Sequence, residues 1–112
     1  MTTKLIQDIK ENALAMKLNN AQRVNGYKVE KIEISYGFAV SCMSSRHKNY
    51  MINFYNDGGF ELCVGALSWW KIHEEVKREE AALTISSCLE KIQSKNNKKT
   101  LLSRFKSFLT EH

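Results

Sequence analysis

Apolar and polar residues alternate at every second position in the middle of the chain. Between Tyr50 and Asn56 the apolar positions are Ile52 and Phe54, and after Asp57-Gly58-Gly59 they are Phe60, Leu62, Val64 and Ala66. A period of two is the strand period, and a short glycine-containing loop joins antiparallel neighbours. We therefore predict a hairpin whose three-residue loop, Asp57 to Gly59, pairs Phe54 with Leu62 and Ile52 with Val64.

The same period marks two strands before this hairpin. Apolar residues take one side of residues 29–36 (Ile32, Ile34 and Tyr36) and one side of residues 38–44 (Phe38, Val40 and Cys42). A three-residue turn around Gly37 places Ile34 opposite Val40, and the polar loop of residues 45–49 places Cys42 opposite Ile52. The apolar sides then coincide, which predicts an antiparallel meander of four strands.

Helical spacing flanks the strands on both sides. Residues 3 to about 18 carry one apolar stripe, and a helix there would end by Asn25-Gly26. Residues 68–94, with Ser68 as N-cap, carry two stripes: Ile72, Val76 and Leu83, and nearly opposite them Ala82, Ile85, Leu89 and Ile92. They therefore form one bent helix or two helices. After a polar loop at 93–99, residues 100–110 predict a last helix with the apolar face Leu101, Leu102, Phe105, Phe108 and Leu109.

This order of elements predicts a single α+β domain over residues 1–112. An N-terminal helix and two or three C-terminal helices pack on one face of the four-stranded sheet. The other face is more apolar than a purely solvated surface requires, because it carries Met43, Met51, Tyr55 and Leu67. Trp69 and Trp70 follow at the expected strand-to-helix corner, where either both are buried or one is exposed for binding. We predict these six residues to be the partner-binding surface.

The net charge of +5 lies at one end of the chain. Residues 1–90 hold 11 Lys and Arg against 11 Asp and Glu, whereas residues 91–112 hold six basic residues against Glu111 alone. The basic patch consists of Lys91, Lys95, Lys98, Lys99, Arg104 and Lys106. A local basic surface favours a protein partner with an acidic surface, a nucleic acid or an anionic membrane surface. The alternative is a solvated face that only aids solubility.

Several classes of protein are disfavoured by the composition. No apolar run approaches the roughly 18 residues of a membrane span, and the first residues lack the apolar core of a secretory signal. The three cysteines, Cys42, Cys63 and Cys88, are an odd and unclustered set, which is unlike a disulfide scaffold. We expect a cytoplasmic protein with reduced thiols.

No cluster of residues has the spacing of a known chemistry. His47, His73 and His112 are scattered and there is no Cys-x-x-Cys pair, so we expect neither a metal nor another cofactor. Cys63 and His73 are a conceivable nucleophile and base, but no orienting group accompanies them. The pairs Glu74-Glu75 and Glu79-Glu80 are typical of a charged helix face. Gly58-Gly59 opens a strand rather than a helix, which disfavours a phosphate-binding loop. We therefore expect no catalytic residues.

Function follows from the surface rather than from a catalytic motif. The leading hypothesis is a non-catalytic protein-interaction module that binds a partner and blocks or accompanies it, as immunity proteins, antitoxins and phage-type inhibitors do. The alternative hypothesis is a nucleic-acid-binding module that uses the basic C-terminal region.

Overall fold

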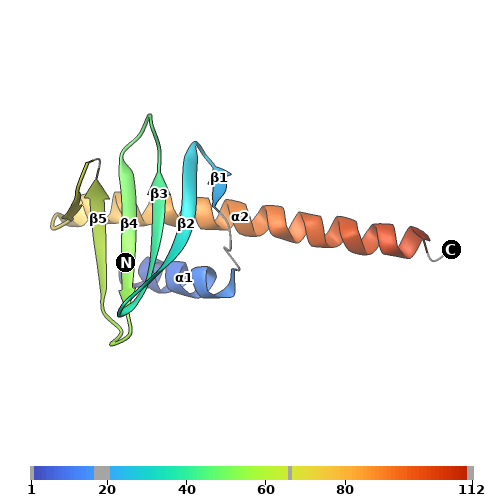
Figure 1. Cartoon of the computed structure of the whole chain (residues 1–112), viewed down its shortest axis with the longest axis horizontal. Helices are drawn as coiled ribbons and strands as arrows, with labels where there is room; N and C mark the ends of the chain where they lie inside the picture. Colours follow the sequence, from blue (N-terminus) through green and yellow to red (C-terminus); the bar gives the residue numbers. More distant parts are fainter. Residues whose placement is uncertain (1, 17–20, 66, 111–112) are drawn as a thin grey trace.

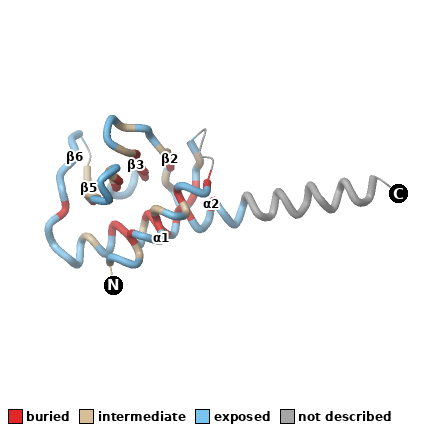
Figure 2. The backbone as a smooth tube through the Cα atoms, turned by 90° about the horizontal axis from the view of Figure 1, so that it is seen from below, coloured by how far each residue is buried: buried red, intermediate tan, exposed pale blue. Residues whose placement is uncertain are grey.

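One antiparallel sheet, with two helices on one side of it, makes up the fold. The computed structural model describes residues 2–16, 21–65 and 67–110, with side chains described as far as Lys95. The elements in chain order are α1 (Thr2–Ala15), β1 (Gln22–Val24), β2 (Tyr27–Ile34), β3 (Gly37–Met43), β4 (Asn49–Tyr55), β5 (Phe60–Gly65), β6 (Trp69–Lys71) and α2 (Glu75–Thr110). The strands pair in the order β1-β2-β3-β4-β5-β6. Helix α2 crosses the strands, and α1 lies beside it on the same side of the sheet (Figures 1 and 2).

The α+β class and the antiparallel meander are confirmed, but the predicted numbers of strands and helices are wrong. The sheet has six strands rather than four, and the described residues form two helices. The predicted loop at 93–99 and the predicted last helix at 100–110 are both part of α2. The apolar face expected for residues 101–109 lies outside the described side chains.

The two additional strands lie at the edges of the sheet. Asn25 and Gly26 both have positive φ, 52° and 81°, and Val24 pairs with Tyr27 across them. A two-residue turn of that kind closes a hairpin, so Asn25-Gly26 joins β1 to β2 and does not end α1. At the other edge, β6 pairs with β5, with Trp69 opposite Gly65. Ser68 therefore precedes a strand, and α2 begins only at Glu75.

The register of the central strands differs from the predicted one by two residues. Phe54 pairs with Phe60 rather than Leu62, and Val40 rather than Cys42 pairs with Ile52. The β4–β5 loop has the predicted length but lies one residue earlier, with Gly58 rather than Gly59 at positive φ (93°). Because the side-chain period is two, an error of two residues leaves every side chain on its predicted face.

The prediction for β2 is wrong by an odd number of residues, which reverses its faces. Ile34 pairs with Gly37 across a two-residue turn, so Ile32 and Ile34 lie on the sheet face away from the helices. Ile32 is 41% exposed and Tyr36, in the turn, is largely exposed. Lys31 lies on the helix side instead, with its Nζ 5.1 Å from the centroid of the Phe38 ring. Its aliphatic chain covers the margin of the core there.

The core lies between the sheet and the helices. Its fully buried larger side chains are Ile9, Val29, Val40, Cys42, Ile52, Leu62, Ile85, Cys88, Leu89 and Ile92. Helix α1 contributes the predicted stripe, with Ile6, Ile9 and Ala13 buried, and Met16 directly after the helix is buried too. Along α2 one of the two predicted stripes is buried, whereas Val76 and Leu83 are exposed. Because α2 buries only one of its two stripes, the helix does not need to bend in order to pack.

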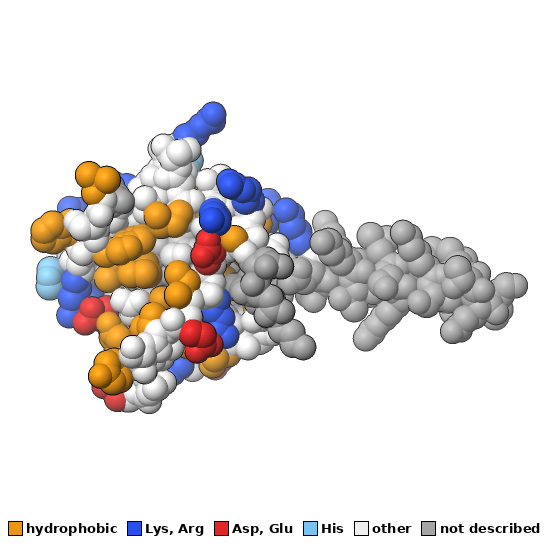
Figure 3. Space-filling view, in the orientation of Figure 1, with side chains coloured by type: hydrophobic (Ala, Val, Ile, Leu, Met, Phe, Trp, Pro, Cys, Tyr) orange, Lys and Arg blue, Asp and Glu red, His pale blue; other side chains and the backbone are white. Residues whose placement is uncertain are grey.

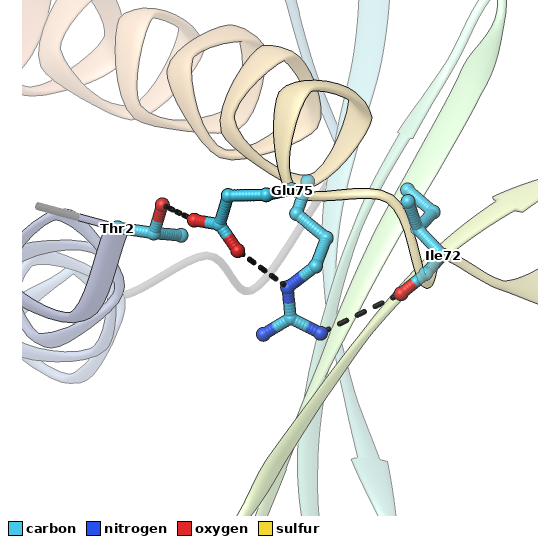
Figure 4. Close-up of polar contacts among 4 residues, drawn as sticks. Thr2, Ile72 and Glu75 are labelled. Carbon is cyan, nitrogen blue, oxygen red and sulfur yellow. Dashed lines mark hydrogen bonds and ion pairs between the residues drawn. The ribbon is translucent and has the colours of Figure 1, made fainter.

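Polar contacts join the start of both helices to the end of β6. The Thr2 hydroxyl donates to Oε1 of Glu75 at 2.5 Å, and Nε of Arg78 lies 3.9 Å from the other oxygen of Glu75 (Figure 4). Arg78 also donates to the carbonyl oxygen of Ile72 at 3.5 Å and lies 5.5 Å from the centroid of the Phe60 ring. This set of contacts fixes where the chain leaves the sheet and enters α2.

Candidate functional site

The sheet face opposite α1 and α2, which we call the outer face, is the candidate site. Because Val40, Ile52 and Leu62 point to the helices, the alternate positions of the same strands point outward. The outer face consists of Arg23 on β1, Lys28, Glu30, Ile32 and Ile34 on β2, Gly37, Ala39, Ser41 and Met43 on β3, Asn49, Met51, Asn53 and Tyr55 on β4, Glu61, Cys63 and Gly65 on β5, and Trp69 and Lys71 on β6.

Small and large side chains are arranged unevenly on the outer face. Ala39, Ser41 and Cys63 are buried although neither described helix covers this side of the sheet. Larger neighbours shield them, and Ile32, Met43 and Trp69 are themselves more than a third exposed. Figure 3 shows apolar side chains gathered over the strands, with charged side chains around them. A contiguous apolar patch of this kind on a sheet commonly marks an interaction site.

The charged residues at the margins of the outer face form pairs. Lys28 and Glu30 on β2 lie 3.0 Å apart, and Glu61 on β5 lies 4.0 Å from Lys71 on β6. Such exposed ion pairs contribute little to stability. They do keep the margins of the apolar patch close to electrically neutral.

Trp69 lies on the outer face over a strand position that has no side chain. A Cβ built on Gly65 would lie 2.7 Å from Cε3 of Trp69 and 2.8 Å from the carbonyl oxygen of Ser68. The glycine therefore allows the indole to rest on the β5 backbone. This contact holds a large aromatic side chain flat against the sheet, where it adds to the apolar patch.

Replacing Gly65 with alanine should move the Trp69 indole off the sheet. Overpacking of this kind costs about 1–3 kcal/mol, and the displaced indole should enter a more aqueous environment. Tryptophan emission in a Trp70→Phe background, which leaves Trp69 as the one indole, should shift to longer wavelength. The same substitution at Gly58, where a Cβ meets nothing within 4 Å, should leave the emission unchanged.

The six predicted partner-binding residues occupy three places. Met43, Met51, Tyr55 and Trp69 lie on the outer face, with Met43 and Tyr55 near opposite ends of the strands. Leu67 lies fully exposed in the β5–β6 turn, where a hollow of about 370 Å³ is lined by Val64, Gly65, Leu67, Ser68 and Trp70. Trp70 is directed to the opposite side of the sheet, next to Val64, and is 69% exposed because β6 is the edge strand.

Two of the six residues of the predicted basic patch have described side chains. Lys91 and Lys95 are exposed on α2 and lie one helical turn apart. Lys98, Lys99, Arg104 and Lys106 belong to the same helix, but their side chains lie outside the described residues.

Cys63, the residue considered as a nucleophile, is buried on the outer face. Burial, together with the nearby Glu61 carboxylate, raises the pKa of the Cys63 thiol, which favours the unreactive protonated form. Glu74 and Glu75 form ion pairs with Lys77 and Arg78 at 3.5 and 3.9 Å, as a charged helix face does. Among the side chains that the structure describes, no three His, Cys, Asp or Glu residues come together as a possible metal site. Neither described helix is apolar over a length that would cross a membrane.

Two cysteines that the sequence analysis does not bring together, Cys42 on β3 and Cys88 on α2, are both buried, and Cys88 lines a second hollow. The interaction between the two thiols, together with burial, raises the pKa of Cys42, and it lowers the pKa of Cys88. The hollow, of about 340 Å³, is lined by Asn25, Tyr27, His47, Leu83, Thr84, Ser87 and Cys88. The only sequence signal for the pairing is that both cysteines lie on buried faces of their elements.

No protein-family model, no curated protein and no solved structure matches this chain. The function is therefore inferred from the geometry of its surface.

Proposed function

We propose that this chain is a non-catalytic protein-interaction module that binds a partner protein on its outer face and blocks or accompanies that partner. The proposal rests on one observation. Met43, Met51, Tyr55 and Trp69 share a sheet face that neither described helix covers. Aromatic and methionine side chains are enriched in the centres of protein interfaces.

The surroundings of the patch support stoichiometric binding rather than catalysis. Its only cysteine, Cys63, is buried and has a raised pKa. Burial also raises the pKa of the Tyr55 hydroxyl, so that group remains neutral and able to donate a hydrogen bond. An apolar centre with neutral hydrogen-bonding groups and paired charges at its margins is the usual composition of a binding surface. A chain of this kind can serve as an immunity protein, an antitoxin or a phage-type inhibitor, with a partner of acidic surface complementing the basic residues 91–112.

Introducing a charge at the centre of the patch should abolish capture of the partner. Met51→Lys places an ammonium group among apolar side chains, and a buried unpaired charge at an interface weakens binding by roughly 2–5 kcal/mol. The measurement is affinity purification of the tagged chain from its native cells, with quantitative mass spectrometry of the proteins that bind in stoichiometric amounts.

The matched control is Val76→Lys, which makes the same change at an exposed position of α2, away from the sheet. The control should recover the partner as the wild-type chain does. If Met51→Lys recovers the partner equally well, the outer face is not the binding surface and the proposal fails.

A second candidate function is nucleic-acid binding by the basic patch. The observation in its favour is that Lys91 and Lys95 are exposed one turn apart on α2, where both can reach the phosphates of one strand. Binding of that kind weakens steeply as salt rises, since each neutralised phosphate releases counterions. Salt-sensitive retention of generic RNA or DNA, unaffected by Met51→Lys, would favour this function over the first.

A further inference from the structure

We infer that, in the absence of another partner, a second copy of this chain covers the outer face, so that two sheets pack face to face as a symmetric dimer. The inference rests on the proposed function only in taking the outer face as a docking surface. It is carried by the size pattern, the charge and the area of that face.

The size pattern is set by the two central strands. On the outer face β3 carries Gly37, Ala39 and Ser41, which form a low track that ends at Met43, whereas the neighbouring β4 carries Met51, Asn53 and Tyr55, which form a ridge. Each ridge residue lies beside a track residue: Met51 beside Ser41, Asn53 beside Ala39, and Tyr55 beside Gly37.

This pattern is complementary to itself. The midpoint of a six-stranded sheet lies between the third and fourth strands, so the greatest overlap of two copies places a twofold axis between β3 and β4, along the strands. That operation sets the β4 ridge of each copy on the β3 track of the other copy. Met51 then faces the partner copy's track at Ser41, and the same contact is made twice. Aligned sheets pack at about 30° in this way, with interdigitated side chains.

Charge also allows two copies of the outer face to meet. The chain carries a net charge of +5, but the excess lies in residues 91–112 and residues 1–90 are balanced. On the outer face the charges are close to balanced too, because Lys28 pairs with Glu30 and Lys71 with Glu61. The twofold arrangement sets β1 of one copy against β6 of the other copy. Arg23, exposed on β1, then lies in the same row as the other copy's Trp69 and can stack on the indole.

The area is sufficient for a modest dimer. At the usual spacing and rise of strands, the six strands cover roughly 540 Å² in projection, so two faces together bury about 1,100 Å² or somewhat more. Specific interfaces begin at about 1,200 Å², and interfaces at this lower end are weak or transient. We therefore expect a reversible dimer that forms at about 10–100 μM chain and that a tighter-binding partner can displace.

Sedimentation velocity of the purified full chain, from about 1 to 200 μM, tests the inference. The wild-type chain should pass from monomer to dimer over this range. Ser41→Trp fills the track with a large apolar side chain and should weaken the dimer by at least about tenfold, because the ridge no longer fits. Non-specific hydrophobic association would instead be strengthened by the added indole, so this result separates the two.

Two further variants complete the design. Arg23→Glu, at an exposed position on β1, should weaken the dimer by roughly tenfold, because the stacking of Arg23 on the other copy's Trp69 occurs twice in the dimer and both contacts are lost. This variant provides the test if Ser41→Trp fails to fold. Val76→Trp adds the same indole on α2 and should leave the dimer unchanged. A wild-type chain that is monomeric throughout, or a dimer that both Ser41→Trp and Arg23→Glu leave intact, overturns the inference. Neither result affects the proposed function, which depends on partner capture and its loss in Met51→Lys.

Discussion

Replacing Gly37 with alanine is expected to lower the free energy of unfolding by more than about 3 kcal/mol, the largest loss of any single glycine substitution in the sheet. A Cβ at this position would lie 1.8 Å from the carbonyl oxygen of Phe54 and 3.0 Å from Cα of Tyr55. Both are backbone atoms of β4, so the clash is relieved only by separating β3 from β4. Urea unfolding monitored by circular dichroism measures the loss.

Gly58→Ala is the matched control for Gly37→Ala. Gly58 has φ of 93°, but a Cβ there would meet nothing within 4 Å. The alanine therefore bears only the conformational cost of a left-handed backbone, about 1–2 kcal/mol. Equal losses in the two variants would show that β3 and β4 do not approach each other as closely at Gly37 as the structure has them.

Leu89→Ala is expected to cost about 2–5 kcal/mol, because the substitution leaves a cavity between α2 and the rest of the core. The Leu89 side chain is fully buried on the stripe of α2 that also carries Ile85 and Ile92. The expected loss is large relative to the total stability of a small domain. Thermal and urea unfolding should both show it, with an unchanged dependence on urea concentration.

Leu83→Ala makes the same change on the same helix at a side chain that is 50% exposed. It should cost less than about 1 kcal/mol, because little apolar area returns to water and no cavity forms. The pair distinguishes one buried stripe on α2 from the two stripes that the sequence pattern allows. A loss at Leu83 as large as that at Leu89 would mean that the second stripe is also packed.

The core was predictable wherever the sequence signal depends only on the strand period. Ile52, Phe54, Val40 and Leu62 were placed inside, although the register of their strands was wrong by two residues. An even error preserves the face of every side chain. The turn between β2 and β3 has two residues rather than three. The predicted register of β2 is therefore wrong by an odd number of residues, which moves Ile32 from the predicted core to the outer face.

The edge strands were missed for a different reason. With three residues each, β1 and β6 are too short to show alternation. For β1 a signal existed, because Asn-Gly between two apolar positions is typical of a tight hairpin turn. For β6 the tandem tryptophans indicated equally a helix start. Only pairing with Gly65, whose missing side chain makes room for the Trp69 indole, decides for the strand.

In the candidate site, too, alternation along the strands predicts some residues, whereas others depend on contacts between elements. Met43, Met51 and Tyr55 were assigned to the outer face from alternation alone, and the structure places them there. That Trp69 joins them while Trp70 is directed to the other side follows from the β5–β6 register. The interaction between Cys42 and Cys88 depends on how α2 crosses β3, which no local pattern specifies.

The order of apolar and polar residues by itself determined the α+β class, the antiparallel meander, the inward set of β3 to β5 and the stripe by which α1 packs. These depend on periodicity, which is a local property of the chain. Tertiary structure alone decided the number of strands, the faces of β2, the single buried stripe of α2 and the track of small residues beside the β4 ridge. These depend on which backbone atoms approach each other across the sheet, and contacts between distant residues leave no periodic signal in the sequence.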